Sequence, residues 1–224
     1  MIDKNAVFDL IGASGALWCR TDMDAMDLAD AVQFVNARHL PLMSVAPNMI
    51  QTVWAWLESS NVKIMTRFYL EGKKITESAI SDVAVQVNTA LRQGAHGAQI
   101  FLTCAMLKDL VEQIYVVRDD LFFNKDLIIG FDIGDVGPFD WTDIFANLRK
   151  INACAVVVAF TCDTGDKSDF VGRIYGMLNA WNAENKFDLH FAFGPNLLRI
   201  EQAQRLVERL RPELKNKLRF WINV

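Results

Sequence analysis

The chain has 224 residues, of which 52% are hydrophobic and 22% charged, so it can form a sizeable core and is not disordered throughout. A net charge of −4 and an isoelectric point near 5.4 argue against nucleic acid or an anionic membrane as a partner, because both need basic patches. No apolar stretch approaches the roughly 20 residues that span a bilayer, and the N-terminus does not have the pattern of a secretory signal. We therefore expect a soluble, cytoplasmic protein.

Strand-like apolar runs alternate along the chain with segments of helical periodicity. The N-terminal segment KNAVFDLIGA is helix-like. The strand-like runs that follow it are, in chain order, ALWCRTD, PLMSVAP, VKIMTRFYL, AQIFLT, DLIIGFDIGD, CAVVVAFT, DLHFAFG and LRFWINV. Seven helical segments lie between them; in IEQAQRLVERL, for example, the apolar residues share one helix face. Eight strands joined by seven helices predict a single parallel (β/α)8 TIM barrel over residues 1–224.

An open, doubly wound sheet is the competing fold. It would more usually show fewer strands and a glycine-rich first turn, and neither G-x-G-x-x-G nor G-x-x-x-x-G-K-[ST] occurs in the sequence. The sequence stops at Val224, at the end of the eighth predicted strand, with no helix after it. We expect residues 1–15 to form a helix that covers this gap or caps the bottom of the barrel. The sixth strand is predicted from about Cys154 to Thr161.

Four scattered cysteines show no C-x-x-C pair and no short spacing to a histidine, which predicts free thiols rather than disulfides or a zinc site: Cys19, Cys104, Cys154 and Cys162. We expect no metal and no cofactor.

Catalytic groups of such a barrel lie at the carboxyl ends of the strands. His39 and His96 fall at the opposite rim and His190 falls early in strand seven, so no histidine is an obvious base for a serine or cysteine nucleophile. The carboxyl ends offer the following candidates: Arg20, Asp22, Ser44, Arg67, Gln99, Thr103, Asp132, Asp135, Thr161, Cys162, Asp163 and Asn196.

Strand alternation indicates which side chains point into the barrel. On strand four it turns Gln99, Phe101 and Thr103 inward. On strands three and five it turns Arg67 and Asp132 inward. A charge inside a barrel is costly unless it is paired, so we expect these two side chains to pair or to share one ligand.

Several strand ends carry recognisable motifs. MSVAP (residues 43–47) is similar to V-C-x-x-P, MTRFYLEG to T-V-x-x-F-P-x-G and GAHGAQIF to G-A-D-E-I-D-x-V. GFDIGD echoes I-I-E-T-G, and FTCDTG echoes I-K-T-S-T-G. With these motifs the chain resembles the deoxyribose-phosphate aldolases and the wider group of class I aldolases on the same barrel, strand by strand over nearly its whole length.

The departures from this family fall on its catalytic positions. The Schiff-base lysine corresponds to Thr161, or to Phe160 if the register slips by one, and the aspartate on strand four corresponds to Gln99. The second lysine, on strand seven, has no counterpart in HFAFGPN, whereas the acid on strand five survives as Asp132. Lys167, in the loop after strand six, is the only lysine near that turn. The resemblance therefore implies the family's fold without its mechanism.

The first functional hypothesis is an aldolase-like barrel, a carbon–carbon lyase by class, that acts on or binds a small anionic metabolite such as a sugar phosphate or keto acid. Arg20 and Arg67 would hold the anion. Asp132 would be the general acid/base. The remaining candidates are Thr161 and Gln99 for catalysis, and Ser44 and Asn196 for binding.

Two other hypotheses stay open. A catalytically degenerate barrel would have an interaction or regulatory role and would present Trp54, Trp56 and Trp181 to a partner. A divalent-metal lyase would use Asp132, Asp135 and Asp163. A homo-oligomer is compatible with each hypothesis.

Overall fold

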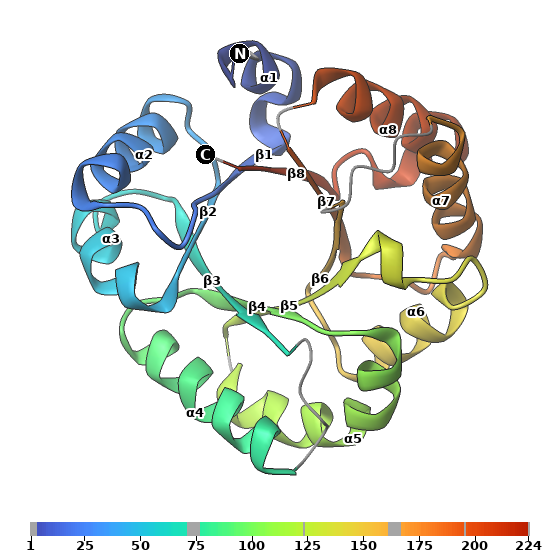
Figure 1. The fold of residues 1–224 in the computed structure, drawn as a ribbon, viewed down its shortest axis with the longest axis horizontal. Helices are drawn as coiled ribbons and strands as arrows, with labels where there is room; N and C mark the ends of the chain where they lie inside the picture. The colour runs from blue at the N-terminus through green and yellow to red at the C-terminus, as the bar shows by residue number, and fades with distance from the viewer. Residues whose placement is uncertain (1–3, 71–76, 123, 161–166, 195, 224) are drawn as a thin grey trace.

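The strands form one closed, parallel barrel in the order β1-β2-β3-β4-β5-β6-β7-β8, with the helices outside it (Figure 1). The structure is a computed structural model that describes residues 4–70, 77–122, 124–160, 167–194 and 196–223. The predicted (β/α)8 barrel is confirmed. An open sheet is excluded, because β1 pairs with β8 from Gly15↔Phe220 to Trp18↔Asn223.

The strands are β1 Gly15–Trp18, β2 Leu42–Val45, β3 Lys63–Tyr69, β4 Gly97–Phe101, β5 Asp126–Asp132, β6 Ala155–Ala159, β7 Asp188–Phe193 and β8 Leu218–Asn223. The helices are α1 Lys4–Ile11, α2 Ala25–Ala37, α3 Ile50–Leu57, α4 Glu77–Arg92, α5 Cys104–Leu121, α6 Trp141–Lys150, α7 Lys167–Ala180 and α8 Leu197–Leu210. Short 3-10 turns are η1 Gly12–Ser14, η2 Pro47–Met49, η3 Ile133–Asp135 and η4 Pro212–Leu214.

Local sequence signals account for the helix boundaries. The side chain of Asp24 caps α2 by accepting hydrogen bonds from the backbone N–H groups of Met26 and Asp27, each at 2.8 Å. The buried residues of α2 then recur at helical spacing and pack on the barrel: Leu28, Ala31, Val32 and Val35. Thr103, predicted to point into the barrel, instead caps α5 by accepting from the backbone N–H of Met106 at 3.2 Å. Strand β4 ends at Phe101, before the alternation reaches Thr103.

Helix α1 lies in the outer ring, between α8 and α2, beside the seam where β8 meets β1 (Figure 1). Its apolar residues Val7, Phe8 and Ile11 are buried in the core between barrel and helices. The rings of Phe8 and Phe34 of α2 meet edge to face, 5.0 Å apart. The N-terminal segment thus covers the gap in the helix layer rather than the bottom of the barrel.

Two apolar layers follow from strand alternation. The larger one lies between strands and helices, and it includes Ile64, Ile100, Ile129 and Phe131. The smaller one fills the barrel itself: Ala16, Trp18, Leu42, Met65, Phe101, Ile128, Ala155, Val157, Ala159, Ala192 and Trp221. The predicted inward and outward faces of strands three to five agree with this division. None of the described helices is long and apolar enough to cross a membrane.

Gly130 on β5 gives a test of the interior packing. A Cβ at Gly130 would lie 2.5 Å from the ring of Phe101, which is itself stacked on Trp18 and Tyr69. We predict that Gly130→Ala lowers the free energy of unfolding by about 1–3 kcal/mol, because the ring has to move. Urea unfolding measures this.

The matched control is Gly172→Ala in α7, where an added Cβ meets nothing within 4 Å. This variant should be neutral or more stable by up to about 1 kcal/mol, because alanine is the better helix former. Equal destabilisation by both substitutions would contradict the packing described for Phe101.

Candidate functional site

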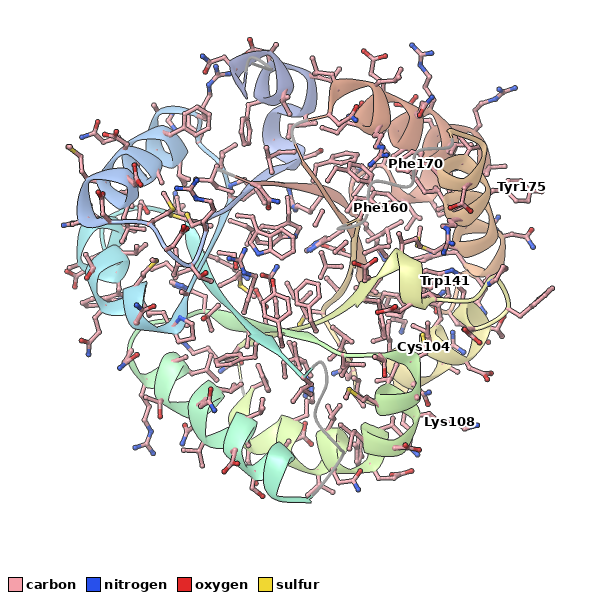
Figure 2. The ribbon with its side chains drawn as sticks, viewed as in Figure 1. Cys104, Lys108, Trp141, Phe160, Phe170 and Tyr175 are labelled. Carbon is pink, nitrogen blue, oxygen red and sulfur yellow. The ribbon has the colours of Figure 1, made fainter. Side chains whose placement is uncertain are left out.

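Side chains fill the centre of the strand ring (Figure 2), and aromatic rings from β1, β3, β4 and β8 contact one another there. Phe101 of β4 stacks on Trp18 of β1, with ring centroids 5.6 Å apart, and on Tyr69 of β3 at 5.0 Å. Trp18 also contacts Trp221 of β8 at 6.5 Å. Aromatic rings therefore occupy much of the space that strand alternation encloses.

The side chain of Arg67 of β3 packs against these aromatic rings. Its guanidinium carbon lies 4.6 Å from the ring centroid of Trp18, and its Nη2 donates a hydrogen bond to the backbone carbonyl of Cys19. Burial lowers the pKa of Arg67 from its ordinary value, while Tyr69 and the Cys19 thiol act in the opposite direction. A desolvated cation over an indole face is stabilised by about 2 kcal/mol. The charge is nevertheless balanced here by an aromatic face and a carbonyl rather than by a carboxylate.

Ser44 and Gln99 lie on the same side of the interior and are fully buried. The Ser44 hydroxyl donates to Oε1 of Gln99 at 2.8 Å. Gln99 is the direct register partner of Arg67 across β3 and β4, and Ser44 is the partner of Trp18 across β1 and β2. The serine therefore fixes the amide so that Nε2, a donor, is the end left for another group.

Within the described part of the chain, three N–H donors of this cluster are buried without an acceptor: Nε1 of Trp18, Nε of Arg67 and Nε2 of Gln99. The Ser44 hydroxyl, by contrast, has its partner. A buried donor without a partner costs about 1–3 kcal/mol. These three residues, from β1, β3 and β4, therefore form a site suited to an acceptor, such as an anion or a carbonyl oxygen.

The sequence analysis missed Trp18 as a polar residue of the site. Alternation along ALWCRTD could have placed it inward, but its free N–H became visible only from its surroundings.

Asp132 is separate from this cluster. Its Oδ1 accepts from the backbone N–H of Gly134 at 2.8 Å and caps η3. Arg67 and Asp132 form no ion pair with one another, so the direct pair that we expected is absent. The register gives the reason: Arg67 is level with Gln99 and Ile128, and Asp132 lies four residues further up β5. Four residues of strand correspond to about 13 Å.

Two other predicted binding residues have local partners. Arg20 is exposed and pairs with Asp22 at 3.3 Å and Asp27 at 3.9 Å. Asn196 caps α8 through Oδ1, which accepts from the backbone N–H of Arg199 at 3.2 Å. Thr161, predicted to be catalytic, lies outside the described residues. Among the binding and catalytic candidates, the structure thus brings together Ser44, Arg67 and Gln99.

The end of β6 bears on the family's Schiff-base position. The inward residues of this strand are Ala155, Val157 and Ala159. Phe160 belongs to the outer layer and packs on Phe170 and Phe193, at 5.0 and 4.8 Å (Figure 2). Phe160 therefore does not belong to the cluster of residues that fills the barrel. Lys167 begins α7.

The metal-lyase hypothesis and the interaction-barrel hypothesis have little support among the described residues. No group of three or more His, Cys, Asp and Glu side chains gathers there for a metal ion, and Asp163 lies outside the described part of the chain. Trp181 is buried and packs on Phe145 and Phe187, so its predicted exposure to a partner is wrong. Trp54 and Trp56 of α3 are exposed by 40% and 42%.

The thiols offer no activated nucleophile among the described cysteines. Burial raises the pKa of the Cys19 thiol to about 12 and that of Cys104 to about 11, well above neutral pH. Burial is also the main reason that the pKa of Cys154 is raised.

Of the histidines, His96 has a structural contact, because its Nδ1 accepts from the backbone N–H of Ile64 at 3.1 Å. His190 lies inside the barrel, where Nδ1 accepts from Nε1 of Trp221 at 3.2 Å. Burial, followed by the charge of Arg219, lowers the pKa of His190 to about 3. His190 is therefore neutral in the folded protein at every pH near neutrality.

This depressed pKa predicts acid sensitivity. Below pH 6.5 the unfolded chain binds a proton at His190 that the folded chain does not, so stability is lost as the pH falls from about 6.5 towards 3. Between pH 7 and 5 the loss from His190 alone should be about 2 kcal/mol. Urea unfolding of wild type and His190→Leu at both pH values measures it: the variant should lack this part of the pH dependence. Parallel pH profiles would contradict a neutral, buried His190.

Comparison with known proteins gives likeness at the level of structure only. No protein-family model and no curated protein matches the sequence. A Toxoplasma gondii protein assigned as a deoxyribose-phosphate aldolase superposes with a TM-score of 0.71 at 10% identity, over 98% of this chain and 93% of its own. A Coccidioides immitis protein with the same assignment gives 0.69 at 10% identity, over 94% and 81%.

A third structure is the tetrameric deoxyribose phosphate aldolase of Aeropyrum pernix. It superposes with a TM-score of 0.62 at 11% identity, over 84% of this chain and 82% of its own. Identities this low establish a common fold, and the resemblance predicted from the strand-end motifs is confirmed at that level. The chain has the barrel fold of the deoxyribose-phosphate aldolases.

Proposed function

We propose that the protein is an aldolase-like barrel that binds the anionic group of a small metabolite, a sugar phosphate or a keto acid, and acts on it without a Schiff-base lysine. One observation carries this proposal. Three buried N–H donors, on Trp18, Arg67 and Gln99, have no acceptor, and one of them belongs to a cation.

Each residue of the cluster has a distinct role in this proposal. Arg67 supplies the positive charge, which is stronger inside the barrel than in water because the aromatic rings exclude solvent. Gln99 supplies a neutral donor whose direction is fixed by the hydrogen bond from Ser44. Trp18 supplies its indole N–H and, with its face, holds the guanidinium in place. A phosphate and a carboxylate both offer enough acceptor oxygens for this set.

Asp132 would act at the upper rim, away from the bound anion. Because it lies about 13 Å further along the strand direction than Arg67, one ligand can reach both only if it is extended and enters with its anionic end first. In that orientation Asp132 would be the general acid or base near the other end of the metabolite. Arg20 and Asn196 remain candidate contacts for that end, as does Thr161, which lies outside the described residues.

The runner-up is a barrel that binds the same anion but no longer turns it over, with an interaction or regulatory role. The small apolar ends of β6 and β7, Ala159 and Ala192, favour it, because neither offers a nucleophile or a proton donor. Assembly into a homo-oligomer, such as the tetramer of the A. pernix protein, fits both versions. Turnover of an aldehyde or keto acid substrate distinguishes the two.

The binding site is tested by Gln99→Glu, which keeps the shape of the side chain and the acceptor for Ser44. The new carboxylate gives Arg67 an internal acceptor and repels an incoming anion. We predict that inorganic phosphate or pyruvate shifts the indole N–H resonance of Trp18 in wild type, and that the variant binds that anion at least about 100-fold more weakly. The thermal stability of the variant should be equal or higher.

Arg205→Gln is the control, because Arg205 is a well-exposed cation on α8 with only an i,i+4 ion pair. It should bind the anion as wild type does. The proposal fails if neither phosphate nor pyruvate shifts the Trp18 resonance, which is the result expected for donors that hold only water. It also fails if Gln99→Glu binds as tightly as wild type.

The mechanism is tested by borohydride reduction in the presence of 2-deoxyribose 5-phosphate or acetaldehyde. We predict no covalent adduct, because the described residues of β6 and β7 contain no lysine to form a Schiff base. Mass spectrometry of the digested protein checks this. An adduct on Lys167 would show that a displaced lysine carries the chemistry, and the lysine-free proposal would then be wrong.

A further inference from the structure

A cavity opens at the opposite end of the barrel, among the amino-terminal ends of the strands. Its volume is about 280 Å³, room for about nine waters. Besides Asn61, its charged and polar lining comes from four strands: Lys63 of β3, Asp126 of β5, Asp188 and His190 of β7, and Arg219 of β8. Nothing in the proposed function uses these residues.

The cavity is lined by two cations and two carboxylates, of which one pair is in contact. Lys63 and Asp126 form an ion pair, with Nζ and Oδ2 2.7 Å apart. Arg219 donates from Nη1 to the backbone carbonyl of Ala13 at 2.8 Å. Arg219 and Asp188 face the cavity from adjacent strands without an ion pair between them. The side chain of Asp188 makes no hydrogen bond within the described chain. One cation and one anion are thus left on the same wall.

His190 lies beside these two groups. It is the direct register partner of Arg219 and stands two residues above Asp188, and its side chain is 3% exposed. Because Nδ1 accepts from Trp221, the proton of the neutral ring is on Nε2. No described residue accepts a hydrogen bond from Nε2, and in this tautomer the ring cannot ligate a metal through that atom.

We propose that this cavity binds a small zwitterion with the chemistry of a free α-amino acid. Its ammonium group lies at Asp188, and its carboxylate lies at Arg219 and Nε2–H of His190. A ligand with one charge would leave the opposite wall charge unmatched, whereas a zwitterion pairs both. The volume leaves ample room for a small amino acid such as glycine. This inference is independent of the proposed function, which concerns the other end of the barrel.

The test titrates glycine into ¹⁵N-labelled protein and follows the imidazole nitrogens of His190. A saturable shift of Nε2 is expected at concentrations up to about 50 mM, as for millimolar affinity. Acetate and methylamine, each carrying one of the two charged groups, should give no saturable shift at matched ionic strength. Asp188→Asn, which removes one charge and keeps the shape, should weaken glycine binding at least tenfold.

Asp109→Asn removes an exposed carboxylate of α5 and should bind glycine as wild type does. Gln99→Glu should leave the glycine response of His190 intact. Asp188→Asn should leave the phosphate or pyruvate response of Trp18 intact. The two proposed sites are therefore tested independently of one another. The absence of a glycine shift overturns the proposal, as does an equal shift by acetate. Full glycine binding by a folded Asp188→Asn overturns it too.

Discussion

Closure of the parallel sheet is the constraint on which the other features depend. Once β1 pairs with β8, every second residue of each strand has to point into a space lined by eight strands. Most of that space is filled by apolar side chains, and the polar ones enclosed with them lose their water. Arg67, Gln99 and Ser44 therefore lie where each hydrogen bond matters, and where an unpaired donor costs about 1–3 kcal/mol.

The barrel has two polar ends separated by aromatic packing. Trp221 contacts Trp18 with one part of its ring system and donates to His190 below it. Above this layer stand the donors of Arg67 and Gln99. Below it stand the charges at the start of β3, β5, β7 and β8. Among the described residues, the unpaired atoms of the Trp18, Arg67 and Gln99 cluster are all donors, which suits an anion, whereas the lower end presents both charges, which suits a zwitterion.

The sequence was sufficient for the fold and for the facing of side chains, because both follow from periodicity. Eight apolar runs at regular spacing predicted the barrel, and alternation predicted that Phe101 and Gln99 point inward. The register between neighbouring strands could not be predicted from the sequence. The expected pair of Arg67 and Asp132 does not form, because the two residues lie four positions apart in that register. The residue at which a strand ends could not be predicted either, since Thr103 caps helix α5 instead of continuing β4.

The candidate site was predictable in part for the same reason. Arg67, Gln99 and Ser44 were identified as candidates one by one. Their grouping, and the addition of Trp18, depend on which strands are neighbours and on which donors already have partners. The likeness to deoxyribose-phosphate aldolases concerns the barrel. The proposed chemistry rests on the buried donors of this chain and not on that likeness.

The central claim is that the upper barrel interior holds an anion. The most direct measurement is anomalous diffraction from crystals grown in bromide, which scatters identifiably and accepts N–H hydrogen bonds. The account predicts an anomalous peak within hydrogen-bond distance of Nε1 of Trp18, Nε of Arg67 and Nε2 of Gln99. Ordered water at that position, with bromide only at the protein surface, would contradict it.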